Sequence, residues 1–170
     1  MDLRSKIREI PDFPKKGILF RDITTLLKDE EAFRKVIEKI TAYYEDEDIE
    51  TVVGVESRGF IFGAPVAYTL GAGFVPVRKP GKLPHDVYEA SYELEYGHDK
   101  LTVHQDAITP GQRVLVVDDL LATGGTMAAT LDLLKQLGAV VVGVVFLIEL
   151  ADLKGRDKLA GYQVLSMITY

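Results

Sequence analysis

The sequence predicts an α/β fold with a central, mostly parallel sheet and helices on both of its faces. Apolar runs that suit buried strands alternate along the chain with segments of helical periodicity. Val114–Val117 contains four consecutive aliphatic residues, as in a strand buried on both faces of a parallel sheet. The length of 170 residues suits one domain with a substantial core, so a single domain over residues 1–170 is expected.

The amino-terminal part is predicted to contain two helices with an extended piece between them. Asp2–Ile10 spaces three aliphatic residues as on one face of a helix, which the prolines of Pro11–Pro14 would end. Gly17–Asp22 is then expected to be extended. Glu30–Tyr44 repeats apolar residues at helical spacing, so we expect an amphipathic helix there.

The middle of the chain is predicted to supply two sheet strands, a helix between them and a hairpin. The polar segment Lys79–Tyr92 has no sustained periodicity, and both a mobile lid and a floppy loop remain open for it. The strands are Thr51–Val55 and Gly73–Arg78, the helix is Phe60–Leu70, and the hairpin joins Ser91–Glu95 to Leu101–His104.

The last third continues the alternation of strand and helix. A helix follows the Val114–Val117 strand, and Gly138 is a suitable stop for it. The remaining predictions are the helix from about Met127 to Leu137, a buried strand at Val140–Leu150, a helical turn at Lys154–Leu159 and an edge strand at Gln163–Thr169.

Composition excludes several classes of function. The net charge of −6 argues against a broad nucleic-acid surface. The chain has no cysteine, which excludes disulfides, thiolate zinc sites and cysteine nucleophiles and fits a reducing compartment. The amino terminus has no signal-type apolar core, and the longest apolar run, Ala139–Ile148, is too short for a membrane span of about 20 residues. We therefore expect a cytoplasmic protein without nucleic-acid or membrane partners.

A candidate phosphate site follows the Val114–Val117 strand. Asp118 and Asp119 come directly after it, where ligands bind in open α/β sheets. In Ala122–Thr126, small residues let the backbone approach a phosphate, two hydroxyls can donate hydrogen bonds, and a helix begins. The spacing differs from Gly-x-Gly-x-x-Gly and from the Walker loop. The alternative is a strand end with two solvated acids and a glycine turn.

A second polar turn, Glu56-Ser57-Arg58-Gly59, follows the strand Thr51–Val55 and precedes a helix. Arg58 beside the free amides of a helix start would make an anion site. Alone, this turn is better interpreted as plain, with one exposed arginine. Two such turns on neighbouring strand ends of one sheet favour a shared anion site.

Other candidates are weaker from the residues alone. Leu19 and Phe20 could be a hydrophobic plug or a platform for a planar base, and the plug is favoured. Glu95 on its own would be an exposed strand charge. No pair of histidines has metal-ligand spacing on one helix face, and only the role of His85 in the proposed lid stays open.

The segment Val117–Met127 resembles the 5-phosphoribosyl-1-pyrophosphate (PRPP) motif of the type I phosphoribosyltransferases. Further segments are similar to the adenine branch of that family, and they span nearly the whole chain. The resemblance implies a type I phosphoribosyltransferase-like fold with a small hood at about residues 1–30 and a flexible lid at about residues 79–92. These segments are Pro11–Pro14, Gly17–Asp22, Glu56–Phe60, Arg78–Pro84 and Glu93–Gly97.

The resemblance implies the conversion of adenine and PRPP to AMP and pyrophosphate in purine salvage. Such a reaction passes through an oxocarbenium-like transition state with inversion at the anomeric carbon. The expected cofactor is Mg²⁺, bound through substrate oxygens and water rather than directly by protein ligands. A homodimer is expected on the same ground.

The resemblance also assigns roles to residues. Asp118 and Asp119 would meet the ribose hydroxyls and the developing positive charge. The 5′-phosphate would lie on Ala122, Thr123, Gly124, Gly125 and Thr126. Pyrophosphate would lie on Glu56, Ser57, Arg58 and Gly59, with Arg78, Lys79 and Lys82 at the start of the lid.

For the base, the resemblance replaces the plug with a stacking role for Phe20. Main-chain atoms of Leu19 and Arg21 would meet the purine edge, and Leu150 would pack on the opposite face. Glu95 is the expected general acid or hydrogen-bond partner at purine N7, and this needs a raised pKa, which a closed apolar pocket can supply. Tyr96 would close the site.

Two alternatives stay open from sequence. One is a phosphoribosyltransferase for another base, hypoxanthine or guanine above all, because base choice depends on main-chain directions near Leu19 and Arg21. The other is a PRPP- or nucleotide-sensing regulator on the same fold. The acidic net charge and the joint presence of Glu95, Arg58 and the acid pair count against a regulator.

Overall fold

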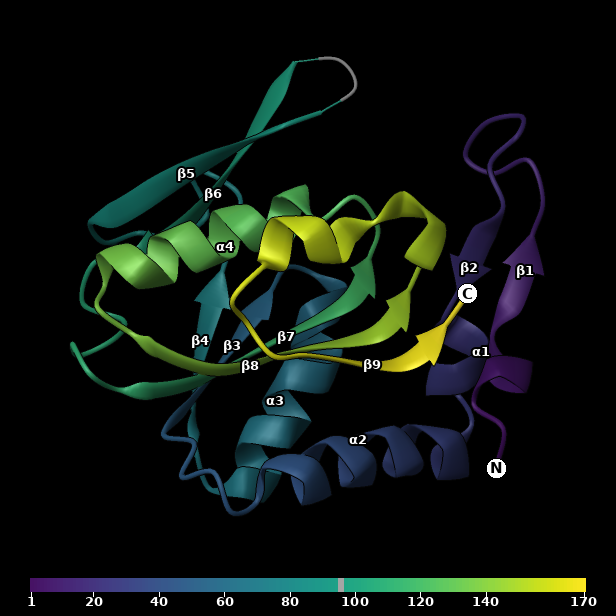
Figure 1. Cartoon of the computed structure of the whole chain (residues 1–170), viewed down its shortest axis with the longest axis horizontal. Helices are drawn as coiled ribbons and strands as arrows, with labels where there is room; N and C mark the ends of the chain where they lie inside the picture. Colours follow the sequence, from purple (N-terminus) through teal and green to yellow (C-terminus); the bar gives the residue numbers. More distant parts are fainter. Residues whose placement is uncertain (95–96) are drawn as a thin grey trace. The chain divides into compact units, whose positions relative to one another are not determined.

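The structure is a computed structural model of the chain, and it describes residues 1–94 and 97–170. The chain divides into two compact units, Met1–Lys39 and Ile40–Tyr170, with helix α2 running across the division. In chain order the elements in Figure 1 are the 3₁₀ helix η1 (Arg4–Lys6), β1 (Arg8–Ile10), β2 (Phe20–Asp22), α1 (Thr24–Leu27), α2 (Glu30–Tyr44), β3 (Thr51–Val55), α3 (Arg58–Leu70), β4 (Gly73–Val77), β5 (Val87–Glu93), β6 (His98–His104), β7 (Arg113–Leu121), α4 (Gly125–Gln136), β8 (Val140–Glu149), the 3₁₀ helices η2 (Ala151–Leu153) and η3 (Gly155–Leu159), and β9 (Val164–Thr169).

The amino-terminal unit contains an antiparallel pair of short strands, β1 and β2. The prediction of a helix over Asp2–Ile10 is wrong, because the segment forms only one 3₁₀ turn before strand β1. Cross-strand charges explain the difference. Arg8 Nε donates to Asp22 Oδ2 at 2.9 Å, and Arg21 pairs with Glu9. Opposite charges facing each other stabilise a strand pair, and they outweigh a three-residue helical spacing.

The second unit is built on a five-stranded parallel sheet with the strand order β4-β3-β7-β8-β9 (Figure 1). The predicted strands and the two helices between them are confirmed, including the edge position of β9. From β3 the chain proceeds to its neighbour on one side, β4, whereas from β7 it proceeds to β8 on the other side. The strand order therefore reverses between β3 and β7, and ligands bind at such a switch point in open α/β sheets.

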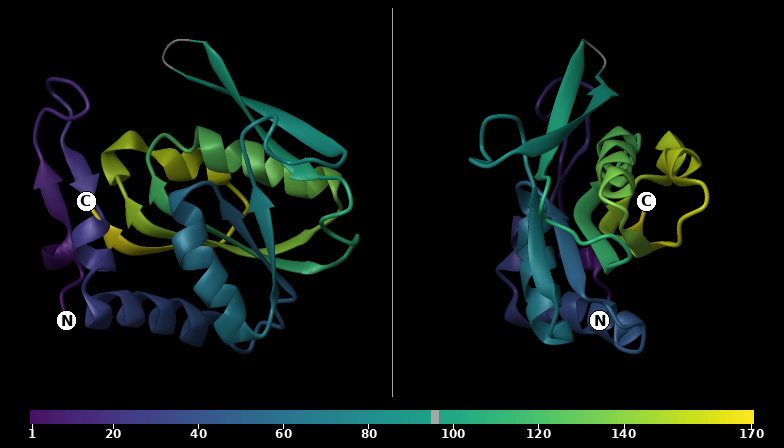
Figure 2. Two further views of the ribbon diagram at one scale, coloured as in Figure 1. Left: turned by 180° about the vertical axis from the view of Figure 1, so that it is seen from behind. Right: turned by 90° about the vertical axis from the view of Figure 1, so that its left-hand side faces the viewer.

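Helices α3 and α4 lie on opposite faces of this sheet (Figures 1 and 2). Alternation along β7 explains how both faces are filled. Val114 and Val116 join the core cluster that contains Leu131 and Leu134 of α4. Leu115 is also buried, but its side chain points to the opposite face, where α3 lies. A strand that is covered on both faces has a continuous run of apolar residues, and β7 has such a run.

The hairpin β5–β6 packs against α4 and is joined to the end of β4. The hairpin was predicted, but its first strand begins at Val87 rather than Ser91. The second half of the predicted lid is therefore strand, because Tyr88, Ala90 and Tyr92 alternate inward against the core cluster. Arg78 and Thr102 exchange two backbone hydrogen bonds that join the hairpin to the sheet.

Within the described ranges, no helix is both long enough and apolar enough to cross a membrane.

Candidate functional site

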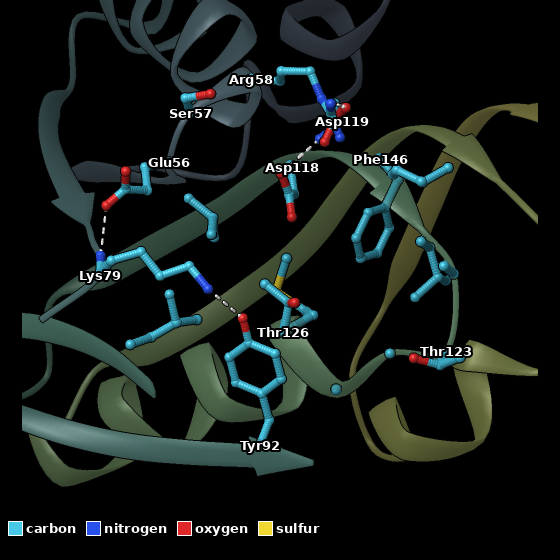
Figure 3. Close-up of a pocket in the computed structure, with 18 residues that line it drawn as sticks. Glu56, Ser57, Arg58, Lys79, Tyr92, Asp118, Asp119, Thr123, Thr126 and Phe146 are labelled. Atoms are coloured by element: carbon cyan, nitrogen blue, oxygen red, sulfur yellow. Dashed lines mark hydrogen bonds and ion pairs between the residues drawn. The ribbon is translucent and has the colours of Figure 1, made fainter. Parts of the chain in front are cut away.

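A cavity of about 400 Å³ opens at the carboxyl ends of β3 and β7, where the strand order reverses (Figure 3). The two polar turns predicted to share an anion site meet there. Its polar lining consists of Glu56, Ser57, Arg58, Lys79, Tyr92, Asp118, Asp119 and the loop Ala122–Thr126, and its apolar lining consists of Val55, Leu101, Leu120, Leu121, Met127 and Phe146.

The acid pair lies within β7 rather than after it, because the strand continues to Leu121. Asp118 Oδ1 accepts a hydrogen bond from the N–H of Asp119 at 2.8 Å. Burial raises the pKa of the Asp118 carboxyl well above its usual value, and the neighbouring Asp119 carboxylate raises it further. Burial and the neighbouring carboxylate therefore disfavour the ionised form of Asp118 relative to an exposed aspartate.

Arg58 connects the two turns. Its Nε donates to Asp119 Oδ2 at 2.5 Å, and the two side chains point toward each other in Figure 3. Asp119 is buried, while half of the Arg58 side chain is exposed. The approach of α3 to β7 depends on Gly59, where a Cβ would lie 2.9 Å from Asp118 Oδ1. Gly59 thus packs behind the acid pair and does not line the cavity.

The Glu56 carboxylate lies against two cationic side chains and one backbone amide. Its carboxylate accepts a hydrogen bond from the N–H of Lys79 at 2.5 Å and another from Lys82 Nζ, and Arg78 Nε lies 3.6 Å away. Burial by itself would raise the pKa of Glu56, but the hydrogen bonds from Lys82 and from the Lys79 N–H outweigh it and lower the pKa. Arg78 and Lys82 do not line the cavity; they lie beside it, against Glu56.

Lys79 points into the cavity from the end of the sheet, and the hairpin holds its ammonium group. Lys79 Nζ donates to the Tyr92 hydroxyl at 2.7 Å (Figure 3). It also donates to the Asp99 carboxylate. The Tyr92 hydroxyl also donates to Asp99 Oδ2 at 3.2 Å. Desolvation opposes the charge on Lys79, yet the hydrogen bonds from Lys79 to Asp99 and Tyr92 raise its pKa overall.

The loop Ala122–Thr126 forms the wall opposite the Glu56 turn (Figure 3). Gly124 adopts φ +88° directly before α4, a backbone conformation that a side chain disfavours. The first amides of α4 have no acceptor within the helix, so they are available to an anion together with the hydroxyls of Thr123 and Thr126. The structure thus confirms the predicted order of a glycine-containing loop followed directly by a helix start.

The residues predicted to bind the base belong to several segments. Leu19, Phe20 and Arg21 lie in and beside β2 of the amino-terminal unit, where the Phe20 ring meets the Phe13 ring edge-on at 5.1 Å between centroids. Leu150 follows β8 and is half-buried. The predicted acid Glu95 and the closing residue Tyr96 lie outside the described residues.

Sequence reasoning missed Tyr92, Leu101 and Phe146. Tyr92 was assigned to the end of the polar segment and to the start of the hairpin strand Ser91–Glu95, but to no site, although its alternation with Tyr88 and Ala90 indicated an inward-facing strand position. Phe146 and Leu101 read as ordinary core residues, and only the three-dimensional arrangement shows that they also line a cavity.

The carboxylates of the site determine how a metal ion could be held there. Asp119 is already paired with Arg58, and the oxygens of Glu56 are bound to cations and an amide. In the described part of the chain, no group of three or more His, Asp or Glu side chains is arranged to hold a metal. A Mg²⁺ ion bound here would therefore take most of its ligands from a bound phosphate compound and water.

Comparison with known proteins identifies relatives along the whole chain. The family model described as the phosphoribosyl transferase domain matches residues 22–168. An adenine phosphoribosyltransferase from Acaryochloris marina is 61% identical over 170 residues, which are 100% of both chains. One from Clostridium perfringens is 59% identical and is covered to 99% of its length.

Solved structures have the same fold. The crystal structure of adenine phosphoribosyltransferase from Thermoanaerobacter pseudethanolicus superposes with a TM-score of 0.95 at 54% identity, covering 99% of this chain and 98% of that one. The enzyme from Saccharomyces cerevisiae, in complex with an imino-altritol bisphosphate and adenine, has a TM-score of 0.93 at 41% identity, covering 98% and 96%.

Proposed function

Since the chain belongs to the phosphoribosyltransferase family, and within it to the adenine phosphoribosyltransferases, we propose that it transfers the 5-phosphoribosyl group of PRPP to adenine. The products are AMP and pyrophosphate, as in purine salvage. The observation that carries this proposal is the meeting of the acid pair, the loop Ala122–Thr126 and Arg58 in one cavity at the switch point of the sheet.

In this reaction adenine N9 bonds to the anomeric carbon of PRPP while the bond from that carbon to pyrophosphate breaks, with inversion, and N9 loses its proton. The transition state has oxocarbenium character. Catalysis requires two oriented reactants, charge balance on the leaving group and exclusion of water. The residues of the cavity can supply the first two.

On the ribose side, we assign the 5′-phosphate to the amides and hydroxyls of Ala122–Thr126. Asp118 and Asp119 would accept hydrogen bonds from the ribose hydroxyls and stabilise positive charge at the anomeric carbon. The ligand hydroxyls would supply donors that favour the ionised form of the buried Asp118 side chain.

On the pyrophosphate side, the turn Glu56–Gly59 and Lys79 are the binding elements. Arg58 and Lys79 supply positive charge directly, whereas Glu56 acts through the groups that it holds, the Lys79 N–H and Lys82. Arg78, which also lies against Glu56, would add charge at the start of the Lys79–Asp86 loop. Mg²⁺, held mostly by PRPP and water, would neutralise charge on the leaving pyrophosphate.

On the base side, Phe20 would stack on adenine, Leu150 would pack on its other face, and the main chain at Leu19 and Arg21 would meet the purine edge. Glu95 would protonate or hydrogen-bond N7, with Tyr96 closing the site. The support for these assignments is the similarity to adenine phosphoribosyltransferases over the full chain.

We further propose a cytoplasmic homodimer, an assignment that rests on the family. Light scattering at two protein concentrations tests the oligomeric state: a mass of one chain at both would contradict the dimer.

The deciding experiment is turnover with PRPP and Mg²⁺ against adenine, hypoxanthine, guanine and orotate, one base at a time. We expect AMP formation from adenine and at least about a hundredfold lower kcat/KM for the other bases, since unpaired polar groups in a base site are costly. Preferred turnover of another base would leave the phosphate site in place and refute the base assignments. PRPP binding without any turnover would favour a regulator.

A further inference from the structure

A side-chain cluster outside the cavity stands directly behind the phosphate loop. It consists of Glu149 at the end of β8, Arg156 in η3 and Ser166 in β9. Arg156 Nε donates to Glu149 Oε1 at 2.7 Å and its second guanidinium nitrogen, NH2, donates to Oε2 at 2.8 Å. Ser166 adds a hydrogen bond to Oε2 at 2.6 Å, and Arg156 also donates to the carbonyl of Val164 at 3.1 Å.

This cluster fixes the backbone next to it. Glu149 is buried, and it lies opposite Leu121 in the β7–β8 register, one residue before the phosphate loop. About half of the Arg156 side chain is exposed, but its two-pronged pairing with the buried Glu149 carboxylate and its further bond to the Val164 carbonyl give it a defined geometry. Arg156 is therefore held in place, and so is Gly155, the residue that precedes it.

Gly155 is in direct backbone contact with the phosphate loop. A Cβ on Gly155 would lie 2.5 Å from the carbonyl oxygen of Ala122, and a Cβ on Gly124 would lie 2.6 Å from the carbonyl oxygen of Gly155. Two backbone segments can approach this closely because both positions are glycine. The Gly155 peptide thus supports the left-handed turn at Gly124, and Gly155 itself does not line the cavity.

From these contacts we propose that Arg156, together with Glu149 and Ser166, is a positioning device for the 5′-phosphate. It holds the Gly155 backbone against Ala122 and Gly124, so that the loop Ala122–Thr126 is preorganised for a pentose phosphomonoester. The proposal rests on the proposed function, which assigns the 5′-phosphate to that loop. It predicts that Arg156 affects the ribose 5-phosphate half of the site and leaves the pyrophosphate half unchanged.

The experiment measures binding of ribose 5-phosphate and of pyrophosphate with Mg²⁺, each by calorimetry, to the wild type and three variants. Arg156→Ala removes the cluster, and Arg156→Lys retains the charge but loses the planar fork, so it remains usable if the alanine variant folds poorly. Arg113→Ala is the matched control. Arg113 also donates twice to one acceptor, the carbonyl of Glu47 at 3.0 and 2.8 Å, but at the opposite end of β7.

We expect Arg156→Ala to weaken ribose 5-phosphate binding about tenfold and Arg156→Lys to weaken it less, with pyrophosphate binding within about twofold of wild type in both. Arg113→Ala should change neither. Hydrogen exchange should be faster at the amides of Ala122–Thr126 in the Arg156 variants and not in the control.

Two results would overturn the proposal. One is unchanged ribose 5-phosphate binding in a folded Arg156→Lys or Arg156→Ala variant. The other is an equal loss for both ligands, which would indicate a general structural role. If the wild type itself fails to bind ribose 5-phosphate, the proposed function is refuted at the phosphate loop and the role of Arg156 is refuted with it.

Discussion

The guanidinium of Arg58 and the carboxylate of Asp119 meet at 2.5 Å across the switch point of the sheet. One belongs to the turn after β3 and the other to β7, so this pair joins the proposed pyrophosphate and ribose halves of the site. When both halves are occupied, the substrate would offer each group a further partner: phosphate oxygens for Arg58, and ribose hydroxyls for Asp119. In the ligand-free protein, the Arg58 guanidinium therefore offsets the negative charge of the buried Asp119 carboxylate.

Arg58→Ala should therefore raise the KM for PRPP about ten- to a hundredfold, the range for losing a charge-assisted hydrogen bond. Arg58→Lys should retain part of the affinity. Initial rates at saturating adenine measure the effect, and Arg113→Ala, which lies at the opposite end of β7, should leave the KM unchanged. An Arg58→Ala enzyme with wild-type KM for PRPP would exclude direct binding by this residue.

The raised pKa of Asp118 predicts that this residue lowers the free energy of unfolding at neutral pH while it serves ligand binding. Its pKa is raised by burial and by Asp119, so between the unfolded value of about 3.9 and the folded value the native state binds the extra proton. In that window the free energy of unfolding falls as pH rises, and the loss persists above it. Asp118→Asn, which can still accept from the Asp119 N–H, removes this titration.

We expect the ligand-free Asp118→Asn variant to unfold a few degrees higher than wild type at pH 8, with a smaller difference at pH 4. AMP should raise its Tm less than it raises that of wild type, because a ribose acceptor has lost its charge. Calorimetric scans at the two pH values check both. A Tm difference that does not change between pH 4 and pH 8 would contradict the raised pKa.

Much of the sheet could be predicted because its signal is local. Thr51–Val55 and Val144–Ile148 are predominantly apolar runs that are buried along their whole length, and a strand in that position needs no alternation to be recognised. The parts of the candidate anion site were predictable for a similar reason, since they are contiguous: an acid pair, a glycine loop and a helix start follow one another between Asp118 and Gly125.

The missed features depend on contacts between distant residues. Arg8–Ile10 is a strand because Arg8 and Glu9 face Asp22 and Arg21, which helical spacing within Asp2–Ile10 does not reveal. Gly155 touches Gly124 across 31 positions of sequence, and a lone glycine beside a lysine carries no sign of that. Tyr92 reaches the cavity because the whole hairpin packs on α4.

Glu95 is the residue proposed to act on the base, and its role predicts a split between kcat and binding. Glu95→Gln should lower kcat by about a hundredfold or more while PRPP affinity stays within about threefold, because the group acts at purine N7 and not on PRPP. Glu93→Gln, two residues earlier on the exposed side of β5, is the control. Single-turnover rates together with PRPP titration separate the two quantities, and equal losses in both would exclude the acid role.

Lys79 is bound by the hairpin in the ligand-free protein, through Asp99 and the Tyr92 hydroxyl. Its ammonium group has a third N–H donor for a phosphate oxygen, but we expect the Asp99 carboxylate to share its positive charge with the ligand. Asp99 then competes with the ligand, both by pairing with Lys79 and by placing a negative charge near an anion. Lys79→Ala should weaken pyrophosphate binding about tenfold, whereas Asp99→Asn should strengthen it a few-fold.

Both variants can be compared by calorimetry with Mg²⁺ and pyrophosphate, and ribose 5-phosphate should bind to each as it does to wild type. Lys100→Ala is the control for lost charge on the hairpin, because Lys100 pairs with Glu89 at 3.5 Å on an exposed part of the β5–β6 pair. If Asp99→Asn weakens pyrophosphate binding instead, Asp99 orients Lys79 for the ligand rather than competing for it. The direction of that single change therefore decides whether the hairpin restrains the cation or presents it.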